Sequence, residues 1–421
     1  MPNRRPRLGL WLPILLVMAA AQGSAQDWPR VTEVRFSGNR ITQEKVMLRE
    51  MSLGPGDRAD PAAIEGSRQA ILDLGLFRDV AIRTEPHDEG VALLVEVREK
   101  RYFLPVPRVD TSSDGDFSYG AQVRWSNVFG LNHRLNAFVE EGDFPEDRRR
   151  ESERTLRLSY TAPFIGDTRQ ELYADLEKLD RVVPSPQGGY EEEFRRLELR
   201  LDRDFTRGRP RQGWTLGGGL FFEDHDTAGA AAPPADGRTT ALVGVADYSD
   251  LRFHVHSETG REFAARMELA ADGVGSDYGY RHLTARWFDS RTIGSREHQT
   301  LHLLAAAGVR DASGRLRDSF SLGGSGRLRG YESDFLQGDR YYYGAVEYLR
   351  PLRWNWLRLL VTAEAGGAER DRAGTTDASP YASLGVGVRV RVTWFVDVEI
   401  EAGLAVPLRG GDGVRFFAGG N

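Results

Sequence analysis

The sequence predicts an all-β transmembrane barrel of about 16 antiparallel strands, preceded by one small α+β domain. Three observations support this prediction. From residue 102 onward apolar and charged side chains alternate with a period of two, aromatic residues recur beside short turns, and the chain begins like an exported protein. A sheet with one apolar and one charged face, edged by aromatic side chains, is typical of a barrel that crosses a membrane.

Residues 1–25 have the pattern of a secretory signal peptide. A basic start is followed by an apolar stretch at 8–21 and by two small residues, Gly23 and Ala25, before a predicted cut ahead of Gln26. The apolar stretch is shorter than the roughly 20 residues that a spanning helix needs. No later segment supplies such a run, so we expect any membrane-embedded part of the chain to consist of strands.

Composition excludes several classes of function. The 421 residues carry a formal charge of −6, which becomes −9 once the three signal arginines are removed, so nucleic-acid binding is not expected. The chain has no cysteine, which excludes disulfides and thiolate metal sites. The mean hydropathy of −0.46 is too polar for a helical membrane protein but suits a barrel with a polar lumen. We expect no cofactor.

Residues 28–99 are predicted to form the small α+β domain. Its elements come in the order strand, helix, helix, strand and strand, at 31–36, 42–51, 60–74, 78–85 and 91–99. Thr42 is expected to cap the first helix. Asp60, which precedes Pro61, is expected to cap the second helix, and Gly75 to end it.

This order resembles a polypeptide-transport-associated (POTRA) domain. The resemblance rests on Gly38 and Asn39 after the first strand, on residues 54–57 between the helices, and on LGLFRDVAI (74–82), which contains Gly75 and Phe77. It implies a periplasmic domain that takes unfolded or secreted client proteins by strand addition to a sheet edge. The alternative is a generic small α+β domain.

Residues 102–421 are predicted to form the barrel. In the segment 395–406, for example, Val398 and Ile400 share one face and Glu399 and Glu401 share the other. The sixteen predicted strands cover approximately 102–110, 117–126, 132–141, 153–161, 169–179, 192–204, 213–223, 239–250, 260–271, 279–289, 298–309, 340–350, 356–366, 382–392, 395–406 and 412–419.

The turns support a membrane barrel over a soluble β protein. Aromatic residues such as Trp125 and Trp214 flank the short turns at one rim, whereas long polar loops at 141–152 and 223–238 mark the other rim. The short turns recur about every 40 residues, a period that also suits a β-propeller. A propeller needs four short strands per period, and this chain has two long ones. A soluble β-sandwich is the other alternative.

The segment 310–338 between strands eleven and twelve contains the motif GRLRGY at 326–331. Because the chain enters from the periplasm, odd strands run outward and this loop starts on the extracellular side. With WSNVFG (125–130), YTAPFIGD (160–167) and GAVEYLRP (344–351), the motif resembles the outer-membrane protein-assembly and translocation superfamily, also called the bacterial surface antigen family. That superfamily includes the BamA/TamA-like proteins and the two-partner secretion transporters.

The resemblance implies that this loop folds into the lumen. Arg329, Gly330 and Tyr331 match the loop motif of the family, whose arginine pairs with an acidic residue of the barrel wall. Glu364 stands at that acidic position, where the family usually has Asp, and the alternation places it on the lumen face. The chain departs from the family in two respects. It has one POTRA-like domain, and its last strand lacks the aromatic end that is frequent in the family, because Phe416 and Phe417 lie some residues before the end.

Catalytic and metal-binding constellations are not expected. Ser325 lies in GGSGR, which lacks a glycine of the nucleophile elbow. The acidic run 223–226 falls in a predicted external loop, where solvation is the simpler interpretation. His254 and His256 share a strand face without a third ligand. The chain is therefore predicted not to be an enzyme.

The predicted function is to help insert, assemble or translocate proteins at the bacterial outer membrane, with the barrel in the lipid and the POTRA domain in the periplasm. The seam between the first and last barrel strands is the expected working part, because an open sheet edge can template an incoming strand. The alternative is a passive pore or a structural barrel without assembly activity.

Overall fold

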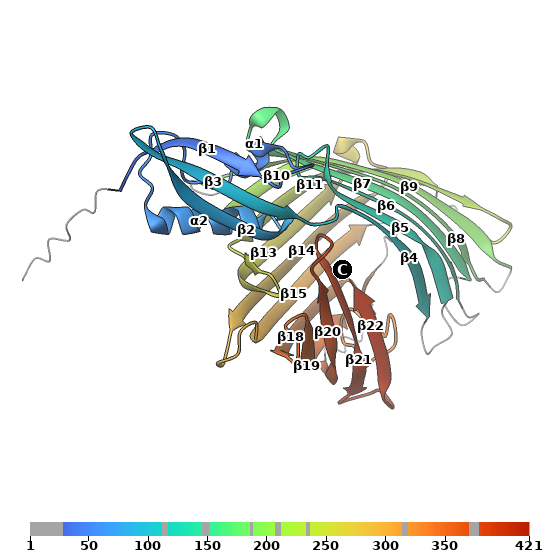
Figure 1. Cartoon of the computed structure of the whole chain (residues 1–421). Coiled ribbons are helices and arrows are strands. Elements are labelled where there is room, and N and C mark those ends of the chain that lie inside the picture. Colours follow the sequence, from blue (N-terminus) through green and yellow to red (C-terminus); the bar gives the residue numbers. More distant parts are fainter. Residues whose placement is uncertain are drawn as a thin grey trace, which may run out of the picture.

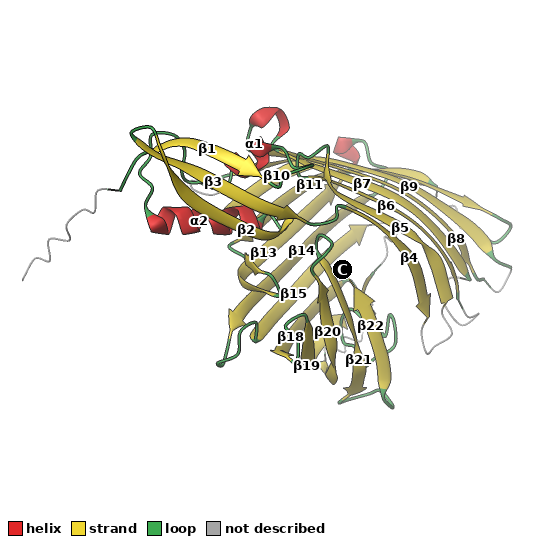
Figure 2. Ribbon diagram, in the orientation of Figure 1, coloured by secondary structure: helices red, strands yellow, loops and turns green. Residues whose placement is uncertain are grey.

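The computed structural model describes residues 28–111, 117–144, 151–185, 188–206, 212–232, 236–313, 319–369 and 379–420. A small domain packs across one end of a large barrel (Figure 1). Strands make up nearly all of the chain outside the small domain (Figure 2). None of the helices in these ranges is long and apolar enough to cross a membrane. The predicted signal peptide, residues 1–25, lies outside the described residues.

The small domain has the predicted element order. Its elements are β1 (Val31–Ser37), α1 (Glu44–Leu48), α2 (Pro61–Asp73), β2 (Phe77–His87) and β3 (Gly90–Glu99). The sheet order is β1-β3-β2, with β1 parallel and β2 antiparallel to β3. Met47, Ile71, Phe77 and Val95 are almost wholly buried between the helices and the sheet. This core holds the two helices on one face of the sheet.

Gly38 and Gly75 occupy backbone positions that favour glycine. Gly38 has φ 84°, and a Cβ there would lie 2.0 Å from the carbonyl oxygen of Val97. Gly75 ends the second helix with φ 72°. The cap of that helix is also as predicted, since the Asp60 side chain accepts from the backbone N–H of Ala62 at 3.2 Å.

The prediction for Thr42 is wrong. The first helix begins at Glu44, its N-cap residue is Gln43, and no side chain caps it. Thr42 instead donates its hydroxyl to Glu99 Oε1 at 2.6 Å and lies 3.0 Å from the hydroxyl of Tyr102. The hydroxyl hydrogen thus bonds to a carboxylate, and the hydroxyl oxygen accepts from Asn127 Nδ2 at 2.9 Å instead of from a backbone N–H of the helix.

The large domain is a closed antiparallel barrel, which confirms the predicted fold class. In the described residues it holds sixteen strands of six residues or more and the three-residue strand β12. The strands are β4 (Phe103–Thr111), β5 (Phe117–Val128), β6 (His133–Asp143), β7 (Ser152–Pro163), β8 (Gln170–Val183), β9 (Tyr190–Asp204), β10 (Gly213–Ala228), β11 (Gly237–Ser249), β12 (Arg252–His254), β13 (Ser257–Ala270), β14 (Gly279–Thr292), β15 (Thr300–Ser313), β18 (Arg340–Pro351), β19 (Leu357–Glu369), β20 (Tyr381–Val392), β21 (Val398–Pro407) and β22 (Arg415–Gly420).

Three details of the barrel differ from the prediction. The turn between β11 and β13 contains the extra strand β12, which pairs with the start of β13. Strand β10 pairs with β11 as far as His225 and with β9 as far as Ala228, so the acidic run 223–226 lies in the wall and not in an external loop. There His225 is buried and stacks on Phe194 with ring centroids 3.9 Å apart. Residues 395–397 belong to a turn, and β21 begins at Val398.

The two faces of the wall differ as the alternation predicts. On β9, Leu199 and Leu201 are exposed on the outer face. Arg196, one of the alternate residues, donates to Glu223 at 2.7 Å on the other face. Exposed aromatic residues gather at the end of the barrel that the small domain covers, including Trp125, Phe129, Trp214, Trp354 and Trp356. An apolar outer band with an aromatic rim is suited to lipid.

The connection between β15 and β18 folds inward. After Ser313 the described chain resumes at residue 319 and forms a hairpin of β16 (Phe320–Leu322) and β17 (Leu336–Gly338). Its apolar residues, among them Leu328 and Tyr331, are buried against Tyr341 and Tyr343 of β18. Strand β15 is the eleventh of the sixteen, so the loop follows the strand from which it was predicted to start.

Candidate functional site in the lumen and at the barrel mouth

The GRLRGY motif is a compact turn at the tip of the inward hairpin. Its N–H and C=O groups bond within the loop: Gly323 N donates to Arg327 O at 3.1 Å, and Tyr331 N to Leu328 O at 2.9 Å. Leu328 has φ 53°, and its side chain is fully buried. These bonds fix the direction in which Arg329 leaves the turn.

Arg329 and Glu364 meet in the lumen. The Arg329 Nη1 donates to Glu364 Oε1 at 2.7 Å, and the Arg329 backbone N–H donates to Glu364 Oε2 at 2.7 Å. Glu364 also accepts from the hydroxyls of Tyr343 at 2.7 Å and Ser383 at 3.0 Å. The carboxylate is 3% exposed and the arginine 7%, so both charges are largely withdrawn from bulk water.

Three further charged residues, which the sequence reasoning did not single out, complete this cluster. Arg329 Nη2 donates to Glu347 and to Glu401, each at 2.9 Å. Arg389 joins the same two carboxylates, at 2.8 Å from Glu347 Oε2 and 2.6 Å from Glu401 Oε2. Two guanidinium groups thus share three carboxylates, and every acid is hydrogen-bonded, as buried charges require.

Gly330 and Tyr331 seat the loop against β20 and β21. A Cβ on Gly330 would lie 2.8 Å from both Pro407 N and Val406 C, so only a glycine fits this approach. The Tyr331 hydroxyl lies 2.9 Å from Ala382 O and 2.6 Å from Arg409 O. The motif therefore fits a surface made by the C-terminal strands.

The loop joins five consecutive strands. Arg329 reaches Glu347 on β18, Glu364 on β19 and Glu401 on β21, and Tyr331 reaches the backbone of β20. The Arg329 guanidinium also lies 5.3 Å from the ring centre of Phe417 on β22. The contacts of Arg329 and Tyr331 therefore connect β18 to β22, the last five strands of the barrel wall.

The small domain is fixed to the barrel mouth by a first contact at Thr42. Asn127, in the bulged end of β5, donates to the Thr42 hydroxyl at 2.9 Å. Asn39, one of the predicted POTRA motif residues, donates to Thr42 O at 3.1 Å, and Gln43 N donates to Gly130 O at 2.9 Å. The segment after β1 thus docks on the turn between β5 and β6.

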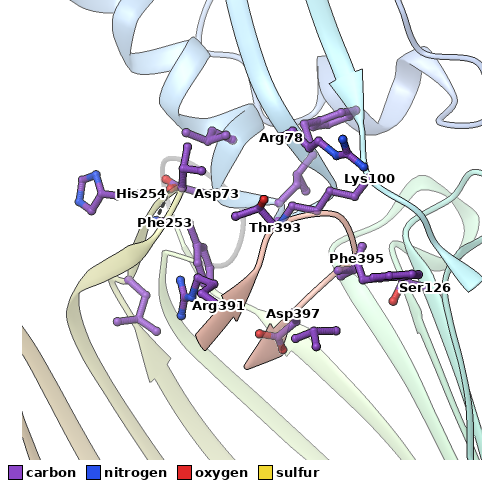
Figure 3. Close-up of a pocket in the computed structure, with 18 of the residues that line it drawn as sticks. Asp73, Arg78, Lys100, Ser126, Phe253, His254, Arg391, Thr393, Phe395 and Asp397 are labelled. Carbon is purple, nitrogen blue, oxygen red and sulfur yellow. Dashed lines mark hydrogen bonds between the residues drawn. The ribbon is translucent and has the colours of Figure 1, made fainter. Parts of the chain in front are cut away.

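A second contact lies on another side of the mouth, at the end of α2 (Figure 3). Asp73 Oδ1 accepts from the backbone N–H of Phe253 at 2.9 Å, and Gln69 Nε2 donates to Phe253 O at 3.0 Å. Gln69 also donates to Asp73 Oδ1 at 2.7 Å, which holds the two side chains together. The unpredicted strand β12 therefore presents its backbone to the small domain.

Between these contacts lies a cavity of about 400 Å³. Arg78 and Lys100 line it from the small domain, and Arg391, Phe395 and Asp397 line it from the barrel (Figure 3). Burial, and then repulsion from Arg391, lowers the pKa of Lys100 to about 8. No group of three or more His, Cys, Asp or Glu residues in the described ranges could hold a metal ion.

The fold and these contacts define a membrane β-barrel with one POTRA domain and a luminal loop. Residues 29–100 match the family model POTRA, described as surface antigen variable number repeat. Over 114 residues the chain is 33% identical to the outer membrane protein assembly factor BamA of Neorickettsia risticii. The aligned region is 25% of this chain and 14% of that protein. Over 330 residues the chain is 23% identical to the chloroplastic outer envelope protein 80 of Oryza sativa, covering 72% and 47%.

Solved structures agree on the fold. BamA of Haemophilus ducreyi lacking POTRA domains 1–3 matches with a TM-score of 0.57 at 15% identity, over 93% of this chain and 84% of that one. CdiB of Acinetobacter baumannii matches with a TM-score of 0.64 at 14% identity, over 94% and 74%. The chain spans less than half the length of the curated relatives it matches. The chain is thus similar to BamA in sequence over part of its length, and to BamA and CdiB in fold.

Proposed function

We propose that this protein helps to insert, assemble or translocate other polypeptides at the bacterial outer membrane, with its barrel in the lipid and its POTRA domain in the periplasm. The observation that supports this proposal most is the fixed seat of the POTRA domain on the barrel. Two contacts, Thr42 with Asn127 and Asp73 with Phe253, hold the domain across the mouth. A polypeptide bound to the domain is thereby held beside the barrel.

The POTRA sheet offers the surface that binds a client. In the order β1-β3-β2 the two outer strands are β1 and β2, and each has one side without a strand partner within its three-stranded sheet. Unpaired N–H and C=O groups along an edge add an extended segment of unfolded or secreted protein through main-chain hydrogen bonds. Recognition of this kind depends little on the client sequence, which suits a factor with several clients.

The barrel seam between β4 and β22 is the proposed working part. Strand β22 pairs with β21 over six residues, whereas β21 pairs with β20 over ten. The last strand therefore has a small share of the hydrogen bonds of the wall. The contacts of the loop connect β18 to β22 on that side, so an opening would separate β22 from β4 rather than spread through the neighbouring strands.

The test measures other barrel proteins after this one is depleted. An assembly factor lowers the abundance of its clients in the outer membrane, and affinity capture from outer membranes identifies them. Normal client levels with altered uptake of small solutes would support the alternative, a passive pore or structural barrel. The charged lumen, with pairs such as Arg196 with Glu177 at 2.6 Å, is the feature compatible with that alternative.

The proposed location has a separate test. A barrel folded in lipid resists SDS at room temperature, so the protein in an outer-membrane fraction is expected to migrate faster before heating than after it. Recovery of the full chain as a soluble periplasmic protein would contradict the proposed location.

A further inference from the structure

The cavity of about 400 Å³ between the POTRA domain and the barrel mouth combines charged and apolar walls. Five of its lining residues are cationic and four are acidic. Two of the cations, Arg78 and Lys100, come from the POTRA domain, and Arg391 comes from the barrel (Figure 3). Much of the remaining wall is apolar and includes Phe253 and Phe395.

A β-bulge in the POTRA sheet places Arg78 beside Lys100. The register between β2 and β3 pairs Phe77 with Glu99 and Asp79 with Arg98, which leaves Arg78 as the extra residue. A bulge re-aims a side chain that would otherwise follow the alternation of its strand. Lys100 directly follows Glu99, so both cations leave the sheet at the end that faces the barrel.

The side chains of Arg78 and Lys100 have no partner. Among the described residues neither forms an ion pair or a side-chain hydrogen bond, and Arg78 Nε is buried. By contrast, Arg391 donates to Glu399 at 2.6 Å and to Glu258 at 2.9 Å. A charge withdrawn from water is unfavourable unless it is paired. The POTRA side of the cavity therefore offers donors that a bound anion would satisfy.

The positive charges around the cavity also repel one another. Burial is the main cause that lowers the pKa of Lys100 to about 8, and the charges of Arg391 and Arg78 act in the same direction. Asp397 opposes them, but it forms no ion pair with Lys100 in the described part of the chain. An anion between these groups would offset the repulsion and hold the POTRA domain to the barrel.

The lining also selects the kind of anion. Guanidinium and ammonium groups bind a carboxylate through charge-assisted hydrogen bonds. The acidic lining residues, Glu50, Asp73, Glu262 and Asp397, would repel a doubly charged phosphate more than a singly charged carboxylate. The apolar wall and the volume suit an anion that carries an apolar group rather than a bare ion.

We propose that this cavity binds the carboxylate of an amphiphilic ligand at Arg78 and Lys100 and thereby locks the POTRA domain on the barrel. Two sources offer this chemistry, a free organic acid and an acidic side chain within an apolar segment of an extended polypeptide. The polypeptide source rests on the proposed function, whereas the site itself does not.

The experiment measures docking with and without a carboxylate. The full chain is folded in phosphatidylcholine nanodiscs, and amide hydrogen exchange is followed at residues 252–254, since the Phe253 N–H bonds to Asp73 across the domain contact. Hexanoate is compared with hexanamide, which has the same chain length and no charge, at equal ionic strength. Calorimetry gives the dissociation constant. Hexanoate at about ten times this constant should slow exchange through undocking about tenfold, and hexanamide should not.

The double variant Arg78→Met/Lys100→Met tests the two cations. It removes charges that oppose docking, so residues 252–254 should stay protected without ligand, but hexanoate should no longer slow their exchange. Arg98→Met, an exposed position on β3 outside the cavity, should respond as the parent protein does. Equal protection of the parent protein and the double variant by hexanoate would overturn the proposal. Protection of the parent protein by hexanamide or by inorganic phosphate, but not by hexanoate, would also overturn it, whether or not the double variant folds.

Two peptides distinguish the sources of the carboxylate. Acetyl-Val-Glu-Val-amide is compared with acetyl-Val-Gln-Val-amide, which differs only in the charge of one side chain. Protection of residues 252–254 by the glutamate peptide alone supports the site with a polypeptide ligand. Protection by hexanoate but by neither peptide supports the site with a free acid and leaves the proposed function to the depletion test. If neither hexanoate nor the glutamate peptide protects these residues, the site does not exist.

Discussion

Arg329 and Glu364 are separated by 35 residues in the chain and share two hydrogen bonds of 2.7 Å in the barrel lumen. One bond comes from the guanidinium and the other from the backbone N–H. The second bond ties the main chain of the loop, and not only a flexible side chain, to β19. The loop tip is therefore held to β19 through its main chain as well as through a side chain.

The first prediction concerns this pair. Arg329→Ala removes the guanidinium that donates to Glu364 and keeps only the backbone N–H, and Glu364→Ala leaves Arg329 without its nearest carboxylate. Breaking one member of a buried pair costs about 3–5 kcal/mol, and luminal water lowers that value. Each single variant should unfold at a lower temperature on a gel-shift assay, and the double variant should lose less than the sum.

Arg327→Ala is the matched control for that cycle, since Arg327 lies in the same loop but rests on the ring of Tyr341 at 5.3 Å instead of joining the carboxylates. Its effect should be smaller than that of Arg329→Ala. Strict additivity in the double variant, together with free labelling of a cysteine at position 329 from outside the cell, would show that the loop stays out of the lumen.

The second prediction is steric. Gly330→Ala places a Cβ 2.8 Å from backbone atoms of Pro407 and Val406, which belong to β21 and cannot yield as a side chain does. Overpacking of this kind costs about 1–3 kcal/mol. Gly326→Ala is the control, because nothing lies within 4 Å of its added Cβ. Protease access to the loop should rise in Gly330→Ala alone, and equal access in both variants would contradict the tight seat.

Most of the barrel was predictable because the residue pattern of each strand and turn depends on its immediate surroundings. A strand between lipid and a polar lumen alternates with a period of two, and each short turn carries aromatic residues. Strand ends were less predictable, since they depend on the neighbours. Strand β10 continues past residue 223 because β11 pairs with it to His225 and β9 pairs with it to Ala228, and nothing in the sequence around residue 223 shows how long these neighbours are.

The site was predictable in part. Arg329 and Glu364 stand out through the family motif, and the structure brings them together. Glu347, Glu401 and Arg389 follow the same luminal alternation as many other charges, so no local signal separates them from the rest. Thr42 was misread because its partners, Glu99 and Asn127, are distant in sequence, and a hydroxyl near a helix start is usually a cap.

The third prediction concerns the seat of the POTRA domain. Asp73→Ala removes the acceptor of the Phe253 N–H, and a lost hydrogen bond to a charged group costs about 1.5–3 kcal/mol. We expect faster hydrogen exchange at residues 252–254 and easier proteolysis between the two domains. Asp73→Asn keeps an oxygen acceptor and should retain most of the protection. If Asp73→Ala exchanges like the parent protein, this contact does not hold the domain.

The last prediction is a pH dependence of the same seat, and it comes from Lys100 in the cavity between the domains. Burial and the charge of Arg391 lower the pKa of Lys100 to about 8, from 10.5 in water. The unfolded or undocked state therefore binds the proton more tightly than the docked state. The charged form of Lys100 weakens docking of the small domain by its full amount below about pH 8. This effect on docking disappears as the pH rises to about 10.5. Docking should thus strengthen between these pH values.

Lys100→Met isolates this effect, because methionine keeps the length of the side chain and has no charge. Domain docking is measured by hydrogen exchange at residues 252–254, with rates corrected for the intrinsic effect of pH at each value. At pH 7.5 exchange at residues 252–254 should be slower in Lys100→Met than in the parent protein. This difference in exchange rate should shrink toward pH 10.5. Arg98→Met is the control, since Arg98 is exposed on β3 and does not line the cavity. A constant difference across this range would show that Lys100 does not titrate with docking.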